Sequence, residues 1–283
     1  MKTKKARDLF IIALIYILAF GLGYLASLPV QSLMLKVFVF DVVATIIVFV
    51  FSVISHNSSV YDAYWSVAPI IMVVWIYLKN SAWSVMQIAF LVVFLFWAFR
   101  LTGNWMEVFT DFSYEDWRYK KFREETPRIF WPVVNFWGIH MMPTLVVFAG
   151  MLPVFEIAKA KLGGLSIPGL LVMLFGIGME LFADRQMHRF LKDGNAGEVC
   201  EHGLWKYSRH PNYLGEISFW LGVYLVMLPY EWSHWYYGTG FLAVGILFNV
   251  VSVPLMEKRQ LARRPQYQVY KACTSRLLLL PRK

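Results

Sequence analysis

Long uncharged stretches alternate with short charged segments along the chain. Eight such stretches cover residues 9–35, 42–61, 63–78, 80–99, 129–155, 162–179, 217–230 and 235–256. A helix of ~20 residues crosses the ~30 Å hydrocarbon core of a bilayer, so the longer stretches can span it alone. The stretches that start at Ala63, Leu162 and Ile217 need polar residues at their ends to reach that length. The pattern predicts an all-α, polytopic integral membrane protein with about eight transmembrane helices.

The basic residues indicate how these spans are oriented. An even number of spans puts both termini on one side, and a cytoplasmic N-terminus then places 23 of the 27 Lys and Arg residues inside. The four on the other side are Lys36, Lys79, Lys159 and Lys161. This asymmetry follows the positive-inside rule, so we expect both termini in the cytoplasm. The expected location is a bacterial inner membrane.

Composition agrees with a membrane protein and excludes several other classes. Hydrophobic residues make up 58% of the chain and charged residues only 16%, which is too apolar for a soluble domain or a disordered segment. Two cysteines, Cys200 and Cys273, support neither a disulfide framework nor a structural zinc site, and no metal is expected. Topology and contact with membrane lipids explain the net charge of +9 without nucleic acid.

Ionisable residues near the ends of the predicted spans are the first functional candidates, because a charge at membrane depth persists only when it is paired or faces a polar cavity. Most of them lie on the cytoplasmic side: Asp62, Arg100, Glu180, Asp184 and Glu216. Their common side indicates one polar cavity that opens inward, although each could also be an independent charge at a helix end. Asp41, alone at the outer end of the second span, is interpreted as such a helix-end residue.

The sixth span carries a polar face. Glu180, Asp184 and His188 recur every four residues, so they share one side of a helix. Two carboxylates at this spacing repel each other unless they have donors, which ribose hydroxyls, an amide or nearby basic residues could supply. The segment 192–204 that follows is polar and contains glycines, as expected of an ordered cytosolic loop able to cover a ligand.

The run from Gly203 to Glu216 adds a second polar face. Pro211 favours the first turn of a helix, which places Arg209 and His210 at a helix N-terminus, where free N–H groups favour an anion. Further in, Asn212, Glu216 and Trp220 share one face. Such an arrangement suits a molecule with phosphates at one end and an amide-bearing ring at the other. Two G-x-G-x-x-A matches, at Gly21 and Gly238, follow no predicted strand, so a nucleotide would bind without a Rossmann fold.

Three segments resemble the steroid 5α-reductase family, in particular its bacterial branch with a domain of unknown function. They are the run 204–216, the sequence Glu180-x-x-Ala183-Asp184 before it, and the tail 265–281, within roughly the last 110 residues. The segments 61–66 and 100–119 also look like the bacterial branch. The resemblance implies a membrane reductase that takes NADPH from the cytosol and delivers hydride to an activated C=C bond of a lipid, such as a 3-oxo-Δ4-steroid or an isoprenoid.

The resemblance, together with the arguments above, implies roles for individual residues within one integral domain, 1–283, whose residues 1–99 form the substrate side and 100–283 the cofactor-binding part. The cofactor-binding candidates are Arg118, Tyr119, Glu180, Asp184, His188, Lys206, Arg209, His210, Asn212, Tyr213, Arg263, Tyr267 and Tyr270. The substrate-binding candidates are Trp65, Trp97 and Arg100, and the catalytic candidates are Asp62, Tyr64 and Glu216.

The reaction explains why a carboxyl or a phenol is needed. Hydride attack on an enone builds negative charge on the carbonyl oxygen, which a proton donor must stabilise. A carboxyl that burial keeps protonated, Asp62 or Glu216, could serve, and Tyr64 is the next candidate. Because Glu216 shares a face with Asn212, it could instead bind the nicotinamide amide.

Two other classes remain open. Membrane methyltransferases that use S-adenosylmethionine carry a similar Arg-x-Pro-x-Tyr-x-Gly run, but they usually show a Glu-Glu pair after the last span, where this chain has the single Glu257. A channel or transporter would explain charges within the membrane but not the long cytosolic motif. Composition does not rank the possible lipid substrates or indicate an oligomeric state.

The first testable prediction concerns topology. Reporter fusions at Arg123 and Lys283 should both report the cytosol, because the basic residues place both positions inside. Opposite locations for the two fusions would reject the model with both ends inside.

Overall fold

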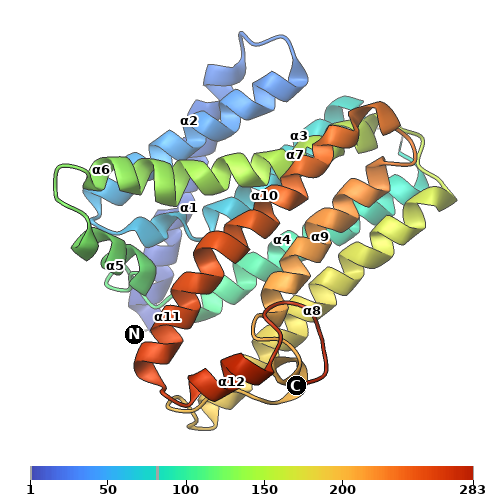
Figure 1. Ribbon diagram of the computed structural model, residues 1–283. Coiled ribbons are helices and arrows are strands. Elements are labelled where there is room, and N and C mark those ends of the chain that lie inside the picture. Colours follow the sequence, from blue (N-terminus) through green and yellow to red (C-terminus); the bar gives the residue numbers. More distant parts are fainter. Residues whose placement is uncertain (1, 81–82, 283) are drawn as a thin grey trace. The chain divides into compact units, whose positions relative to one another are not determined.

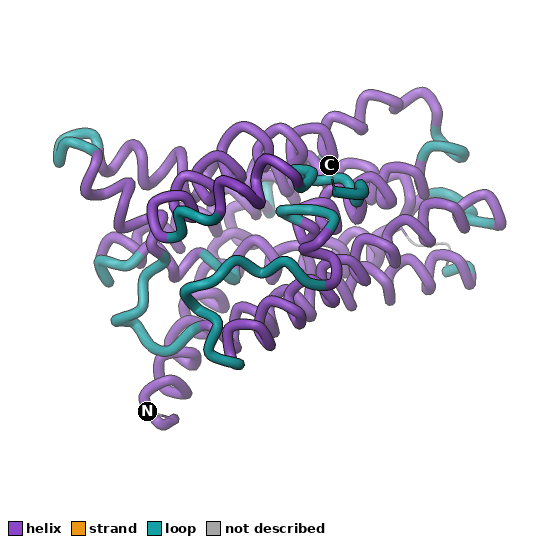
Figure 2. Tube along the Cα trace, turned by 60° about the horizontal axis from the view of Figure 1, so that its bottom comes forward, coloured by secondary structure: helices purple, strands orange, loops and turns teal. Residues whose placement is uncertain are grey.

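The computed structural model describes residues 2–80 and 83–282, and this part of the chain is helical almost throughout (Figure 1). Loops are confined to connections and to the C-terminal segment, and no strand is drawn (Figure 2). The elements are α1 (Lys2–Ser27), α2 (Leu33–Ile54), η1 (Ser58–Tyr61), α3 (Tyr64–Asn80), α4 (Val85–Val108), α5 (Trp117–Glu125), α6 (Trp131–Val133), η2 (Val134–Met141), α7 (Met142–Lys159), η3 (Gly164–Ser166), α8 (Ile167–Lys192), η4 (Gly203–Lys206), α9 (Pro211–Met227), η5 (Trp232–Gly238), α10 (Thr239–Leu247), η6 (Phe248–Ser252), α11 (Val253–Arg263) and α12 (Tyr267–Cys273).

Seven helical segments within the described residues are long and apolar enough to cross a membrane. They are Thr3–Ser27, Leu33–Ile54, Ser58–Asn80, Val85–Val108, Trp131–Lys159, Gly164–Lys192 and Trp232–Arg263. The all-α, multi-pass prediction is therefore confirmed. The eighth expected span, over residues 217–230, corresponds to α9, which has only 17 residues. Both termini lie on the same side of the membrane only if α9 also crosses the bilayer. The reporter fusions measure this.

Several predicted span boundaries were wrong, because an uncharged run does not show where a helix turns. The stretch 9–35 contains the end of α1 at Ser27, a turn around Pro29, and the start of α2 at Leu33. Asp41 consequently lies inside α2 and not at a span end. In the same way, α4 extends past Arg100 to Val108, and α8 extends past Glu180 to Lys192, so these charges lie within helices.

The chain forms two compact units, and residues 100–159 belong with the N-terminal helices. The first unit comprises residues 1–83 and 94–159. In it α1 packs against α2, and α3 packs against α7. Polar contacts join its loops: the Asn57 amide donates to the carbonyls of Phe112 and Tyr114, both at 2.8 Å. These contacts connect the loop before α3 to the segment that leads into α5.

The second unit comprises residues 84–93 and 160–283 and is organised around α8 and α9, which lie side by side in Figure 1. Glycines face each other along this pair. A Cβ atom at Gly222 would lie 2.6 Å from the backbone nitrogen of Met173, and one at Gly176 would lie 2.5 Å from the carbonyl oxygen of Gly215. Small residues let the two backbones approach closely, which is how helices associate where lipid provides no hydrophobic driving force.

The α8–α9 contact predicts different effects on stability for two glycine substitutions. Gly222→Ala should lower the stability of the detergent-solubilised protein by about 1–3 kcal/mol, because the new methyl group overlaps backbone atoms of α8. Gly178→Ala, on α8 with no atom within 4 Å of the added methyl, should leave stability unchanged or slightly raised. Thermal unfolding followed by circular dichroism measures both, and equal melting temperatures for the two variants would contradict the close approach.

Candidate functional site

The centre of the second unit holds two buried carboxylates on the facing helices α8 and α9. Glu180 is 3% exposed and Glu216 is 5% exposed. The Cγ atom of Glu180 packs against Gly215, where a Cβ would lie only 2.5 Å away. Glycine at position 215 therefore lets the Glu180 side chain reach the part of α9 that carries Glu216.

The predicted polar stripe of α9 is present. Pro211 occupies the first turn of α9, as expected, and the indole nitrogen of Trp220 donates to Glu216 Oε1 at 2.9 Å. This bond gives the buried Glu216 carboxyl a donor from its own helix and orients it. Asn212 lies one turn before Glu216 and is half-buried, so its amide continues the stripe toward the start of the helix.

The predicted face of α8 is present as well, because Glu180, Asp184 and His188 all lie within one helix. Asp184 and His188 are half-buried. The segment after α8 folds back onto it: the backbone N–H of Leu204 donates to the Gln186 side chain at 2.9 Å, and the Trp205 indole donates to the Ala183 carbonyl at 3.0 Å. The loop 193–202 is thereby held at the end of the polar face.

A cavity of about 370 Å³ lies between this loop and the last turns of α8. Its lining consists of Gln186, Arg189, Phe190, Asp193, Asn195, Cys200 and His202. It combines a cation, Arg189, and a carboxylate, Asp193, with an aromatic ring and two amides. Lys206, on η4, is exposed, and its Nζ atom lies 5.7 Å from the ring centre of Tyr207.

Arg209 and His210 lie at the N-terminal end of α9, as predicted, but both are buried and face the C-terminal segment. The Arg209 guanidinium donates to Glu257 Oε1 at 2.8 Å and to the carbonyls of Lys271 and Thr274. His210 Nε2 lies 3.4 Å from the same Glu257 oxygen. Burial lowers the pKa of His210, although Glu257 acts in the opposite direction, so the ring is neutral at pH 7. These two residues therefore anchor protein segments to one another.

Other tail residues complete this anchor. The Tyr270 hydroxyl donates to the carbonyl of Trp205 at 2.6 Å, and burial raises the pKa values of Tyr267 and Tyr270. Tyr213 stacks between His210 and Phe248, with ring centres 5.4 and 4.4 Å apart. Arg263, at the end of α11, is exposed. Among the tail candidates, Tyr270 ties the tail to Trp205, Tyr267 is buried beside the Tyr270 ring, and Arg263 is exposed.

The first unit holds the remaining candidates. The Tyr119 hydroxyl donates to Asp62 Oδ1 at 2.6 Å, and burial together with the Asp62 carboxylate raises the pKa of Tyr119. Arg118 pairs with Asp116, at 2.8 Å between Nε and Oδ1. The Tyr64 hydroxyl donates to Asp41 Oδ1 at 2.8 Å. Asp62 and Tyr64 thus have separate partners, and each pair joins a residue at the start of α3 to a different segment.

The expected substrate-side residues differ in burial. Trp97 is completely buried on α4, Trp65 is half-buried at the start of α3, and Arg100 is half-buried one turn after Trp97. Trp97 contacts Phe94, with ring centres 5.4 Å apart. Trp97 therefore forms part of the packed core of the first unit.

The family described as "Protein of unknown function (DUF1295)" matches residues 48–274, which is most of the chain. The chain belongs to this family. A curated relative, "Uncharacterized protein C594.04c" of Schizosaccharomyces pombe (strain 972 / ATCC 24843), is 24% identical over 253 residues, covering 77% of this chain and 72% of the relative. No solved structure matches the chain significantly.

In this DUF1295 protein the structure adds polar residues that sequence reasoning missed. Asp41 is not an isolated helix-end charge: it is 2% exposed and accepts the Tyr64 hydrogen bond inside α2. Nearby, the Thr144 hydroxyl lies 2.8 Å from both the Thr45 and the Tyr61 hydroxyls. The sequence does not show which partners hydroxyl residues in apolar runs will have. Asp41, by contrast, is an acidic residue within an apolar run, and this alone indicates a residue that needs a partner.

Glu257 was also missed as a site residue, although it was noted as a lone Glu after the last span. Its carboxylate accepts a hydrogen bond from Arg209 and lies close to His210 Nε2. It also forms an ion pair with Lys271, at 3.0 Å. One buried carboxylate thus connects α11 to the start of α9 and to the tail.

Removing the negative charge of Glu257 should destabilise the second unit. Glu257→Gln leaves the Arg209 charge buried without its counterion, and breaking such a pair costs about 3–5 kcal/mol. Limited proteolysis should then cut the segment 264–282 faster, and the melting temperature should fall. The matched control is Glu201→Gln, which removes a half-exposed pair with Arg282 and should cost ~1 kcal/mol or less. Equal effects of the two variants would show that Glu257 is not the anchor.

Proposed function

We propose that this DUF1295 protein is a membrane-embedded NADPH-dependent reductase of an activated C=C bond in a lipid, of the steroid 5α-reductase type. The observation that carries the proposal is the arrangement of Glu180 and Glu216 on the facing helices α8 and α9, made possible by Gly215. Buried carboxylates are costly in a membrane protein and mark functional sites when polar ligands can reach them.

The groups around these carboxylates fit a dinucleotide. Glu180, Asp184 and Asn212 offer hydrogen-bond acceptors and an amide, which suit ribose hydroxyls and a carboxamide. Glu180 and Arg189 are nine residues apart in the same helix, or about 13 Å along its axis, so the ligand would be extended. Arg189 and His202 line the cavity at the far end, and Lys206 follows in η4. These basic groups suit phosphates.

The positions of the acidic and basic groups set the orientation of the cofactor in this proposal. The nicotinamide end would lie toward Glu216 and Asn212, and the phosphates toward Arg189, His202 and Lys206. NADPH, when bound, supplies the hydride. Glu216, oriented by the Trp220 indole, would hold the carboxamide or protonate the substrate.

Arg209 and His210 take a different role in this proposal from the one expected from sequence. Through their contacts with Glu257 and with tail carbonyls, these two residues position the start of α9. The direct phosphate contacts are therefore assigned to Arg189 and Lys206, with Arg209 as a positioning residue. Tyr213 stacks on His210, and the Tyr270 hydroxyl donates to the Trp205 carbonyl, so both side chains support the same segment.

On the substrate side, Asp62 and Tyr64 are the remaining candidates for the proton donor to the carbonyl oxygen. The Tyr119 hydroxyl donates to Asp62, and Tyr64 donates to Asp41, so each candidate is held in a fixed orientation by a second polar group. A flat or chain-like lipid with an enone is the proposed substrate class. A bacterial inner membrane is the proposed location.

The proposal predicts selective binding of NADPH. NADPH should raise the melting temperature of the purified protein, and S-adenosylmethionine should not. Glu180→Gln should weaken NADPH binding about 10–150-fold, the loss expected when one charge-assisted hydrogen bond of ~1.5–3 kcal/mol is removed. Glu198→Gln, an exposed acidic residue of the loop outside the cavity lining, is the matched control and should bind as the wild type does.

Two outcomes would overturn the proposal. Stabilisation by S-adenosylmethionine alone would identify a methyltransferase. If Glu180→Gln melts at the wild-type temperature and binds NADPH with unchanged affinity, the carboxylate pair does not belong to the NADPH site.

A further inference from the structure

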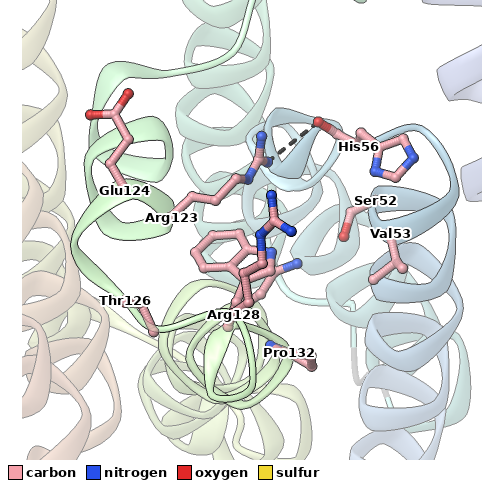
Figure 3. A pocket seen from close by; sticks show the side chains of 10 residues that line it. Ser52, Val53, His56, Arg123, Glu124, Thr126, Arg128 and Pro132 are labelled. Atoms are coloured by element: carbon pink, nitrogen blue, oxygen red, sulfur yellow. Dashed lines mark hydrogen bonds between the residues drawn. The ribbon is translucent and has the colours of Figure 1, made fainter.

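A second cavity, of about 520 Å³, lies in the first unit, and none of its lining residues is assigned to the reductase (Figure 3). Its lining consists of Ser52, Val53, His56, Arg123, Glu124, Thr126, Arg128, Trp131, Pro132 and Asn135. They come from the end of α2, the end of α5, the start of α6 and the start of η2. None of them was a candidate in the sequence.

The cavity lies between the ends of two candidate membrane spans. Its one wall is the last turn of the span Leu33–Ile54, and its other wall is the first turn of the span Trp131–Lys159. Trp131 and Arg128 are residue types that favour this interface, the first for its amphipathic ring and the second for its charge. A ligand in the cavity would therefore have access both to water and to the lipid headgroups.

Two guanidinium groups point into the cavity, whereas the carboxylate of Glu124 points away from it (Figure 3). Arg123 is held from three sides: it donates to Glu115 Oε1 at 2.6 Å and to the His56 carbonyl at 3.3 Å, and it lies over the Trp131 ring at 5.1 Å. Arg128 is exposed and has no ion pair or hydrogen bond with the described residues. Two converging cations, only one of which has a protein counterion, favour an anion between them.

A buried amide adds a fixed donor. Asn135 is 2% exposed and lines the cavity, and its Oδ1 atom accepts from the Ser58 hydroxyl at 2.9 Å. That bond orients the amide, so its Nδ2 group is the side-chain donor that remains for a ligand. Asn135 belongs to the π-helix η2, and such widened turns occur frequently at functional sites.

Apolar surface continues from the cavity on both walls. On α2, Val53 and Ile54 are exposed, and on the other wall Ile129, Phe130 and Val133 are exposed. These side chains belong to or adjoin membrane spans, so acyl chains can lie against them. A ligand that fits the whole surface has an anionic head and apolar chains.

We propose that this cavity binds the headgroup of an anionic membrane phospholipid, with its phosphate between Arg123 and Arg128 and its acyl chains along α2 and α6. The Asn135 amide donates to a headgroup oxygen, and Trp131 closes the apolar side. The site does not depend on the proposed reductase activity, because it shares no residue with the NADPH site.

Native mass spectrometry of the full chain in detergent tests this site with phosphatidylglycerol, phosphatidylcholine and soluble sn-glycerol 3-phosphate as probes. Phosphatidylglycerol should be retained at a lower lipid concentration than the zwitterionic phosphatidylcholine. Arg128→Gln should weaken phosphatidylglycerol binding about 10-fold or more, as expected for one lost charge-assisted contact. Because Arg128 is exposed and has no protein partner to lose, the variant should melt at the wild-type temperature.

The matched control is Lys120→Gln, which removes an exposed charge of α5 outside the cavity lining. It should bind phosphatidylglycerol within about twofold of the wild type. Equal losses in both variants would show diffuse attraction between charges and overturn the proposal, as would wild-type binding by Arg128→Gln. Glycerol phosphate bound as tightly as phosphatidylglycerol would overturn the assignment to a lipid and indicate a soluble phosphate compound.

Discussion

A polar group inside a bilayer has no water to bind, so each one must find its partner within the protein. This constraint explains the arrangement of both units. In the first unit, Asp41 accepts a hydrogen bond from the Tyr64 hydroxyl, and the Thr144 hydroxyl bonds to both the Thr45 and the Tyr61 hydroxyls. In the second unit, Glu216 accepts a hydrogen bond from the Trp220 indole. Each pairing fixes the rotation of its helix, because a turned helix would leave a polar group in hydrocarbon.

Close approach of α8 and α9 follows from the same constraint. Without a hydrophobic driving force between helices, contact depends on backbones that fit closely, which Gly169, Gly176, Gly215 and Gly222 allow. The approach has a functional consequence, since it brings Glu180 of α8 against the turn of α9 that carries Glu216. One set of glycines thus serves both the stability of the helix pair and the assembly of the proposed cofactor site.

Where α11, α12 and the start of α9 meet in the second unit, the Glu257 carboxylate holds these segments together. It accepts from Arg209 and contacts His210 and Lys271, so three segments distant in sequence meet at one carboxylate. A backbone contact extends this anchor, because the Arg209 N–H donates to the Ser275 carbonyl at 2.9 Å. The segment after the loop 193–202 is therefore tied to the tail by side-chain and backbone contacts.

The sequence by itself determined the helical class, the multi-pass arrangement and the shared faces of α8 and α9. Hydropathy shows apolar runs directly, and the spacing of Glu180, Asp184 and His188 needs only the helical period. It did not determine where helices end inside uncharged runs, because turns such as that at Pro29 carry no charge. Only the tertiary structure decided which groups are partners: Arg209 with Glu257, Asp41 with Tyr64, and Ser58 with Asn135. These residues are distant along the chain, and a pairing between distant side chains depends on how helices pack, which no local pattern specifies.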